Sequence, residues 1–490
     1  MKTAKTNIIF ENGVTDNKPH VVILGAGPAG LGAAFQLTRR TQAKVTVLEQ
    51  NNAVGGNAGS FELSEVRVDY GSHRLHPACD PEILSDIRLL LGDELLDRPR
   101  HGRIRLHDRW IHFPLKPLDL ILQLPMSFVT NMTTDLISEF FKKEQDIHGE
   151  ESFASVLEAG LGKTFCKKFY FPYAHKLWGL PPEKLSSVQA HRRVSANSLG
   201  KMVNKILSAV PGIKQNGKGR FFYPRGGFGQ ISECLYQAAK NAGAEFHLGV
   251  KVKSITMTGQ VVEAVSYEQE GQIIIQQADY VWSTIPVSLL VQCLQPSVPP
   301  LVMQACKNID YRAMILIYLV LEQERFSEYD AHYFPELDVP ITRISEPKNY
   351  SNVYNPQNLT VLCAELPCSA NDPVWHMTDE ELGRLVCKCL ESAQIPIRAP
   401  IKEIVTQRLR HAYPIYQKGY EEYLNQIEQW LGGIENLLTF GRQGLFVHDN
   451  THHALYMAYA AVDCLNRRGS FDRVKWQNLR QIFNTHVVED

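Results

Sequence analysis

The sequence carries almost no net charge and contains no long hydrophobic run. Its 51 Lys and Arg residues nearly balance 52 Asp and Glu residues, so the formal net charge is −1, which argues against bulk binding of nucleic acid. It lacks a signal peptide and also the run of about 18 apolar residues that a membrane-spanning helix needs. These absences predict a cytoplasmic protein without nucleic-acid partners. They do not indicate its oligomeric state.

Cysteine is present, but not in the spacing of a metal site. The closest pairs among the ten cysteines are Cys387 with Cys389 and Cys363 with Cys368, and neither pair has zinc-site spacing. The sequence therefore predicts no metal site, and its thiols are expected to be buried in a reducing compartment. A clear catalytic dyad is also absent, which fits chemistry supplied by a bound cofactor.

The clearest positive signal is a βαβ pattern near the start of the chain. Val21–Leu24 is a short apolar run, typical of a strand that is buried on both faces. Gly25, Gly27 and Gly30 follow with G-x-G-x-x-G spacing and open a helical pattern, and a second strand ends at Glu49. The glycines permit a tight turn, close approach to a pyrophosphate and close helix packing, while the acid would bind ribose hydroxyls. This pattern predicts dinucleotide binding.

A glycine doublet after the acid indicates which dinucleotide is bound. Gly55 and Gly56 follow Glu49 closely. This order resembles the extended fingerprint of FAD enzymes in the glutathione-reductase-like group, in which a glycine pair passes close to the FAD phosphates. The resemblance implies FAD rather than NAD as the cofactor.

A histidine-containing loop follows a short strand that ends near Tyr70. Gly71 can turn the chain there, and His73 and Arg74 come next. Such a loop can be an ordinary surface turn, or it can bring an imidazole against a flat ring. The segment resembles the part of UDP-galactopyranose mutases that lies beside the isoalloxazine. The resemblance implies that His73 and Arg74 belong to a catalytic site.

A second aromatic segment resembles the same enzymes. Tyr173, Lys176 and Trp178 are similar to the Y-x-x-K-x-W-G segment of galactopyranose mutases, where it helps to line the substrate cleft. A helix is expected to end near Trp178, because Gly179 and two prolines follow. The resemblance implies that Tyr173 and Lys176 contact substrate and that Trp178 is catalytic. The alternative is that Trp178 is a core residue.

Two further segments resemble the amine-oxidase and protoporphyrinogen-oxidase superfamily. Phe221–Gln230 predicts a strand, a glycine-rich turn and a helix start, and the resemblance implies that backbone near Val252 binds the adenine. Far down the chain, Gly441 and Arg442 belong to a loop that precedes a helix capped near Asn450. The resemblance implies that this helix points its positive amino end at the flavin N1/C2 carbonyl.

Basic residues supply the candidates for binding an anionic substrate. Arg103 and Arg105 alternate on an expected strand and share one face, which fits either a solvated strand edge or an anion-binding wall. The relatives use arginines from the region 301–415 on substrate anions. Arg312, Arg343 and Tyr413 are therefore further candidates for contacts with the substrate.

These signals predict an α/β fold with a Rossmann-like, glutathione-reductase-type FAD-binding domain and an inserted α+β substrate domain. We expect a flexible N-terminus at residues 1–18. The FAD-binding domain is assigned to residues 19–80, 215–290 and 436–490. The substrate domain is assigned to a helical part, residues 81–214, and a sheet part, residues 291–435.

The resemblance leaves several functions open. The main prediction is an FAD-dependent oxidoreductase that transfers hydride from a small-molecule substrate to flavin N5. The first alternative is a reduced-flavin-dependent isomerase of nucleotide sugars, and the second is a non-catalytic binding protein, since Rab escort and dissociation-inhibitor proteins share the fold. The apolar segment Phe113–Phe141 is expected to form an ordinary helical region, with peripheral membrane contact as its alternative.

Overall fold

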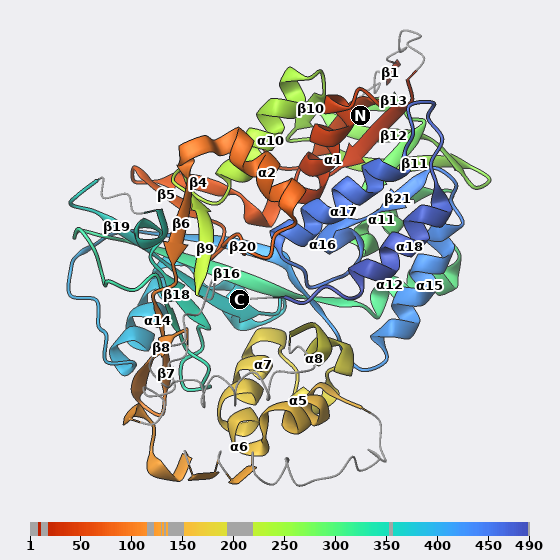
Figure 1. The fold of residues 1–490 in the computed structure, drawn as a ribbon. Helices are drawn as coiled ribbons and strands as arrows, with labels where there is room; N and C mark the ends of the chain where they lie inside the picture. Colours follow the sequence, from red (N-terminus) through yellow and green to blue (C-terminus); the bar gives the residue numbers. More distant parts are fainter. Residues whose placement is uncertain are drawn as a thin grey trace, which may run out of the picture.

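In the computed structural model, the described residues are 8–10, 18–114, 122–128, 130–131, 134–135, 151–193, 219–351 and 356–488. Two larger regions make up the molecule (Figure 1). One is built on a five-stranded sheet, and the other on a seven-stranded sheet with a group of helices below it. Most of the segment Phe113–Phe141 lies outside the described residues.

The five-stranded sheet is parallel throughout and gathers strands that are far apart in the sequence. In spatial order its strands are β10 (Glu245–Leu248), β3 (Lys44–Glu49), β2 (His20–Leu24), β14 (Tyr280–Ser283) and β21 (Leu437–Thr439). The sheet therefore contains strands from all three segments assigned to the FAD-binding domain. The exact domain boundaries stay a prediction.

Helix α1 (Pro28–Arg39) packs closely against α17 (Thr451–Cys464) on one face of this sheet (Figure 1). A Cβ atom at Gly32 would lie 2.9 Å from Cδ2 of Leu455 and 3.2 Å from Cβ of Ala458. The two helices are therefore in close contact. Small residues on both helices allow it, because any larger side chain would push the helices apart.

The neighbouring helices show where periodicity alone misplaces a boundary. The pattern predicts a helix over Pro81–Leu96, but α2 (Pro81–Leu91) ends earlier. Gly92 has a φ angle of +54°, and this left-handed conformation, which glycine adopts easily, stops the helix. The next strand, β6 (Leu95–Pro99), then pairs with β9 (Arg220–Pro224), so apolar residues at 95 and 96 serve a strand.

A second five-stranded sheet contains a short strand in the segment expected to be flexible. Its strands are β1 (Ile8–Phe10), β13 (Gln272–Gln277), β12 (Val261–Gln269), β11 (Lys251–Thr258) and β15 (Leu294–Gln295). Residues 8–10 pair in parallel with Ile273–Ile275. An apolar β-forming triplet can add in this way to the open edge of β13. The flexibility expected of residues 1–18 stays a prediction.

The seven-stranded sheet assembles the expected strands of the substrate region together with an early hairpin. In spatial order its strands are β20 (Ile401–Ile415), β16 (Asp310–Leu321), β19 (Thr360–Cys368), β18 (Arg343–Ser345), β17 (Ala331–Tyr333), β7 (Gly102–Leu106) and β8 (Arg109–Phe113). A small ladder joins β4 (Ser60–Leu63) to β5 (Val66–Asp69). Arg103 and Arg105 thus lie near one end of the sheet.

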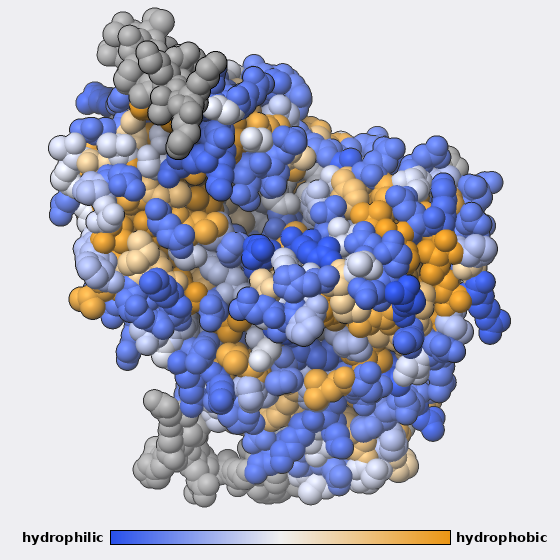
Figure 2. All heavy atoms as spheres, turned by 180° about the vertical axis from the view of Figure 1, so that it is seen from behind, coloured by the Kyte–Doolittle hydropathy of each residue, from blue (hydrophilic) through white to orange (hydrophobic). Residues whose placement is uncertain are grey.

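Most of the remaining helices cover the sheets, and those within residues 153–193 form the lower group in Figure 1. The remaining helices are α5 (Phe153–Leu161), α6 (Lys163–Phe165), α7 (Phe171–Trp178), α8 (Ser187–Arg193), α10 (Gln230–Asn241), α11 (Val287–Cys293), α12 (Pro300–Lys307), α13 (Pro347–Ser351), α14 (Asp379–Ser392), α15 (Tyr420–Gly432), α16 (Gly441–Gly444) and α18 (Arg473–Phe483). Within the described ranges, none of the helices has the length and apolar character needed to cross a bilayer. Hydrophilic residues cover much of the opposite face, with hydrophobic groups between them (Figure 2).

A buried lysine connects the helical group to the seven-stranded sheet. Lys176 on α7 is only 9% exposed. Its Nζ donates to the carbonyl oxygens of Glu336 at 2.9 Å, Val339 at 2.6 Å and Ile341 at 2.9 Å, and also to that of Phe334. Burial lowers the pKa of Lys176 to about 7, while the carboxylates of nearby Asp338 and Glu336 act to raise it. The ammonium therefore holds the turn between β17 and β18 against α7.

We expect Lys176→Met to destabilise the protein. The substitution keeps the apolar stem but leaves buried carbonyl oxygens without donors, and each such acceptor costs about 1–3 kcal/mol. The urea midpoint of the full chain, followed by intrinsic fluorescence, should fall clearly. Lys168→Met is the matched control, because Lys168 is exposed. Equal midpoints for the two variants would contradict the assigned role of Lys176.

Candidate functional site

The glycine turn between β2 and α1 has the geometry of a phosphate cradle. Gly25 has a φ of +97°, and a Cβ atom at Gly30 would clash with the carbonyl oxygen of Gly25. At Gly27, by contrast, an added Cβ would meet nothing within 4 Å. The space beside Gly27 is therefore open at the amino end of α1, where unpaired N–H groups attract phosphate. This arrangement fits the pyrophosphate of a dinucleotide.

The carboxylate of Glu49 organises the backbone around this cradle. Its Oε2 accepts from the N–H of Ala26 at 2.7 Å, and its Oε1 accepts from the backbone N–H of Asn51 at 2.9 Å and from its Nδ2 at 2.8 Å. The backbone N–H of Val250 donates to the carbonyl of Glu49, which brings the Val252 segment beside it. Contacts of Glu49 with ribose and of Val252 with adenine stay predictions.

The second glycine pair lies directly against the first motif. The N–H of Gly55 donates to the carbonyl of Ala26 at 2.8 Å, and a Cβ at Gly56 would lie 3.4 Å from Cα of Gly27. Both glycines of the doublet have positive φ angles. The structure thus brings the two motifs of the predicted FAD fingerprint into one cradle.

Helix α16 (Gly441–Gly444), which lies far from α1 in the sequence, contacts the same cradle. A Cβ at Gly441 would lie 2.7 Å from Cβ of Ala29 in the first turn of α1. The Arg442 guanidinium donates to the carbonyls of Ala412 at 2.9 Å and of Asp449 at 3.3 Å. It thereby fixes the approach to α17, whose N-cap is Asn450, as predicted.

A buried carboxylate that sequence reasoning did not single out lies beside the His73 loop. Asp69 Oδ1 accepts from Ser60 Oγ at 2.6 Å and from the N–H of Phe228 at 2.9 Å, while its Oδ2 accepts from the hydroxyl of Tyr223 at 2.7 Å. Burial raises the pKa of Asp69, and these hydrogen bonds act against that increase. An acid at the end of an alternating strand, next to Gly71, is the only sequence signal for it.

His73 is held in one orientation by Tyr70 and Phe228. Its Nε2 contacts the carbonyl of Tyr70 at 2.9 Å, and its ring stacks on Phe228 with centroids 5.4 Å apart. Because a carbonyl can only accept, the ring proton lies on Nε2 and leaves a lone pair on Nδ1. Burial lowers the pKa of His73, with Asp69 opposing the shift, so the imidazole is neutral at pH 7.

Arg74 and Arg343 are both paired inside the protein. Arg74 donates to the hydroxyls of Tyr333 at 3.1 Å and Tyr350 at 3.0 Å. Arg343 forms a two-pronged contact with Glu365, with distances from Nη2 of 2.7 and 2.9 Å. Glu365 also accepts from the N–H of Ser72 at 2.9 Å. These arginines therefore shape the His73 loop, and a direct substrate contact by either stays a prediction.

A cluster of side chains connects the seven-stranded sheet to the segment before α17. Arg312 and Tyr413 are cross-strand partners on β16 and β20, so their side chains lie on one face. The Tyr413 ring lies 5.0 Å from the guanidinium carbon of Arg442 and 4.9 Å from the His448 ring. Trp178, a fully buried core residue, lies 6.3 Å from the same histidine. Arg312, Tyr413 and Trp178 are thus brought together near Arg442.

Other predicted substrate residues have partners elsewhere. Arg103 lies between the rings of Trp110 and Tyr329, at 4.2 and 4.5 Å. Arg105 is buried and pairs with Asp108, Asp338 and Glu336. Lys176 is occupied by the carbonyls described above, and Tyr173 packs against the helical core. In the described part of the chain, these contacts of Arg103, Arg105 and Lys176 do not involve the glycine motifs.

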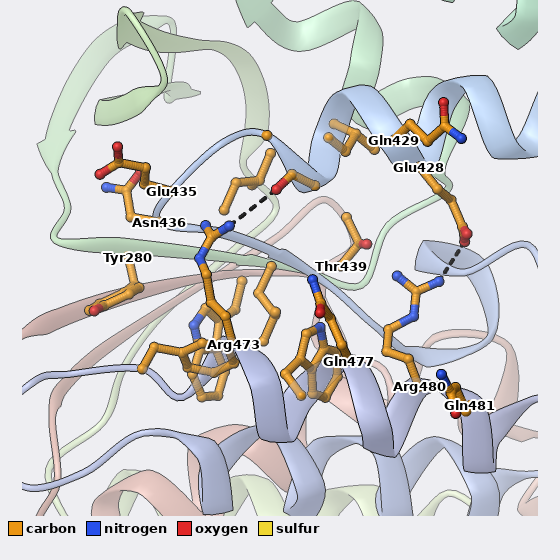
Figure 3. Close-up of a pocket in the computed structure, with 18 of the residues that line it drawn as sticks. Tyr280, Glu428, Gln429, Glu435, Asn436, Thr439, Arg473, Gln477, Arg480 and Gln481 are labelled. Carbon is orange, nitrogen blue, oxygen red and sulfur yellow. Dashed lines mark hydrogen bonds and ion pairs between the residues drawn. The ribbon is translucent and has the colours of Figure 1, made fainter.

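A separate cavity lies away from this site. It has a volume of about 630 Å³ and lies between α15, α18 and the end strand β21 (Figure 3). Arg473 reaches toward the carbonyl oxygens of Gly432 and Ile434, and Arg480 pairs with Glu428. None of its lining residues belongs to the glycine motifs or to the His73 loop.

Comparison with known proteins decides the family. The family model of the flavin-containing amine oxidoreductases matches residues 28–458. This chain is a member of that family. The assignment confirms the resemblance inferred from the sequence and the FAD cofactor. The phosphate cradle and the fold are thereby placed in a known flavoenzyme architecture.

Individual relatives of this flavin-containing oxidoreductase are distant. A phytoene dehydrogenase from Streptomyces griseus is 24% identical over 51% of this chain and 52% of its own length. An L-amino-acid oxidase from Naja atra is 26% identical over 66% of this chain and 62% of its own length. The chain thus matches between half and two thirds of the length of these curated relatives.

The solved structures confirm the predicted fold class. Reduced UDP-galactopyranose mutase superposes with a TM-score of 0.76 at 20% sequence identity, and the match covers 91% of this chain and 93% of the mutase. At this identity the likeness concerns the fold. It shows that the Rossmann-like region and the seven-stranded sheet of this oxidoreductase are arranged as in a known FAD-fold protein.

Gly27→Val should abolish flavin binding while leaving the fold intact. Its side chain would enter the open space in which the pyrophosphate is expected. We expect flavin absorbance of the purified protein to be lost while its circular dichroism is retained. Gly160→Val is the control. An added Cβ there also meets nothing within 4 Å, but Gly160 lies on α5, outside the glycine motifs. Full flavin content in Gly27→Val would overturn the cradle assignment.

Proposed function

We propose that this chain oxidises a small anionic molecule. FAD, when bound, supplies a hydride acceptor at N5. The residues around the expected ring then bind and orient the substrate and exclude water from it. The observation that carries the anionic character of the substrate is the state of Arg312.

Arg312 is a largely buried cation without a close carboxylate. Its side chain is 13% exposed, and the nearest acid, Asp372, lies 3.9 Å away and is 45% exposed. Its Nη2 donates weakly to the carbonyls of Lys176 and Pro367, both at 3.3 Å, and within the described structure its Nε has no hydrogen-bond partner. A buried charge is costly unless it is paired. A carboxylate or phosphate of the substrate would provide that pairing.

The neighbouring residues give the substrate an orientation. Tyr413 lies beside Arg312 on the same face of the sheet and below Arg442, whose segment contacts the first turn of α1. An anion on Arg312 would therefore be held near the flavin end of the cradle. His73 contributes an unprotonated Nδ1, which can accept a hydrogen bond from the substrate or the cofactor.

A second candidate function is isomerisation of a nucleotide sugar by reduced flavin. The same under-paired Arg312 would suit a diphosphate, and the fold likeness to UDP-galactopyranose mutase supports considering this reaction. The two functions differ in their redox requirement. A non-catalytic role is disfavoured, because the complete set of FAD motifs is retained in an open cradle.

Anaerobic mixing with candidate substrates should separate these functions. We expect an L-amino acid or another carboxylate to bleach the oxidised flavin, because hydride transfer reduces it. UDP-galactopyranose should be tested with and without dithionite, and phytoene serves as an uncharged comparison. Turnover of UDP-galactopyranose only after dithionite, without net oxidation, would establish the isomerase instead. Bleaching by phytoene alone would contradict the anionic substrate.

Arg312→Met should weaken binding of the active anionic compound. Loss of one charge-assisted contact costs about 1.5–3 kcal/mol, so the apparent KM should rise roughly tenfold or more. Arg398→Met, which changes an exposed arginine, should leave the KM unchanged. Flavin content should stay equal in both variants. An unchanged KM in Arg312→Met would remove Arg312 from the substrate site.

A further inference from the structure

Three metal-ligating side chains converge where the segment after α18 meets the start of α17. They are Asp449, His453 and His486, and one ligand atom from each lies within 4.8 Å of the others. Asp449 Oδ2 lies 3.0 Å from Nδ1 of His486. The rings of His453 and His486 lie face to face, with centroids 4.3 Å apart. The three residues form a compact set of two imidazoles and one carboxylate.

These side chains are positioned by three separate elements. Asp449 precedes the N-cap of α17, His453 lies in the first turn of that helix, and His486 follows α18. Arg192 on α8 contacts the other carboxylate oxygen, Oδ1, at 3.2 Å. The backbone carbonyl of Arg192 also accepts from the N–H of Val488 at 2.9 Å, and this bond holds the segment containing His486 in place. The cluster is therefore held by the fold rather than by one flexible loop.

We propose that Asp449, His453 and His486 bind a Zn²⁺ ion. Two histidine nitrogens and a carboxylate oxygen are ligands that zinc accepts in a tetrahedral site, with water completing the coordination. Nδ1 of His453 carries no proton, because it accepts from the N–H of Asn450 at 3.2 Å. To bind the ion, this nitrogen would give up that hydrogen bond and turn its lone pair to the metal, while the ring proton stays on Nε2. Zinc would replace the proton that joins Asp449 to His486, and that proton would be released.

The cluster needs only a small contraction to hold the ion. Zinc–ligand distances of about 2.0–2.2 Å place neighbouring donor atoms roughly 3.3 Å apart in a tetrahedron. His453 is partly exposed and the side chain of His486 is 10% exposed. A small rotation of both rings would bring their nitrogen atoms toward the buried carboxylate. Arg192 would remain on Oδ1 and orient the carboxylate, in the way that outer partners orient metal ligands.

The site would fasten the segment after α18 to the amino end of α17. Its ligands come from the start of α17 and from the segment after α18, so a bound ion would join these two parts of the chain. It would link α8, α17 and this segment through one centre. The proposal depends on neither the substrate nor the reaction inferred above.

Zinc binding by the untagged, full-length protein tests the proposal. After chelation and dialysis, we expect one tightly bound Zn²⁺ per chain in a competition titration with a chromogenic chelator. Zinc should also raise the midpoint of thermal unfolding, because it binds the folded state. Co²⁺ should give the visible bands of a tetrahedral site at wavelengths beyond flavin absorption.

Variants distinguish this site from adventitious binding. His453→Ala and His486→Ala should each weaken zinc binding by more than the roughly 10–100-fold that loss of an outer partner costs, and should abolish the thermal shift. His191→Ala is the matched control, because His191 lies on α8 with 59% of its side chain exposed. Unchanged zinc affinity in the two cluster variants, or equal loss in His191→Ala, would overturn the proposal. So would a wild-type protein that binds no zinc.

Discussion

The rest of the structure depends on how closely α1 approaches the β2–α1 turn and α17. Glycines on α1 allow this approach, because they place no side chain at the contacts. At Gly30 a Cβ would strike the carbonyl of Gly25, and at Gly32 it would press on Leu455. These contacts place the amino end of α1 against the sheet and bring α17 alongside it. The phosphate cradle and the position of α17 are thus set by the same packing. Gly27, the glycine beside open space, is the one left for the cofactor.

A different physical problem governs the substrate side, where many charged groups are buried together. Arg343 with Glu365, Arg74 with two tyrosine hydroxyls, and Lys176 with carbonyl oxygens each satisfy their charge or donors within the protein. Such internal pairing fixes loops and strands, but it leaves little attraction for a ligand. Arg312 differs because, among the described residues, its acidic neighbour Asp372 lies 3.9 Å away and is 45% exposed. The contrast between paired and under-paired cations therefore identifies it as the candidate anchor.

The sequence predicts features whose cause is local and misses those whose cause is distant. The turn at Gly25, the cap at Asn450 and the helix end at Gly179 follow from neighbouring residues, and the structure contains all three. Glu336 and Asp338, which pair with Arg105, and the carbonyl oxygens that bind Lys176 come from the turn between β17 and β18, so no spacing in the sequence could reveal these contacts. Asp69 was missed for the same reason, since Tyr223 and Phe228 meet it only after folding. His486 likewise reaches Asp449 from a separate element.

The long sequence separation between α1 and α17 also affects how the chain folds during synthesis. Helix α1 is buried along nearly its whole length, yet α17, which covers one side of it, spans residues 451–464. At synthesis rates of about 5–20 residues per second, α1 would wait roughly 20–80 s for that partner. During this interval its apolar surface is open to other chains. The apolar surface of α1 therefore needs protection, as chaperones provide, until α17 has been synthesised.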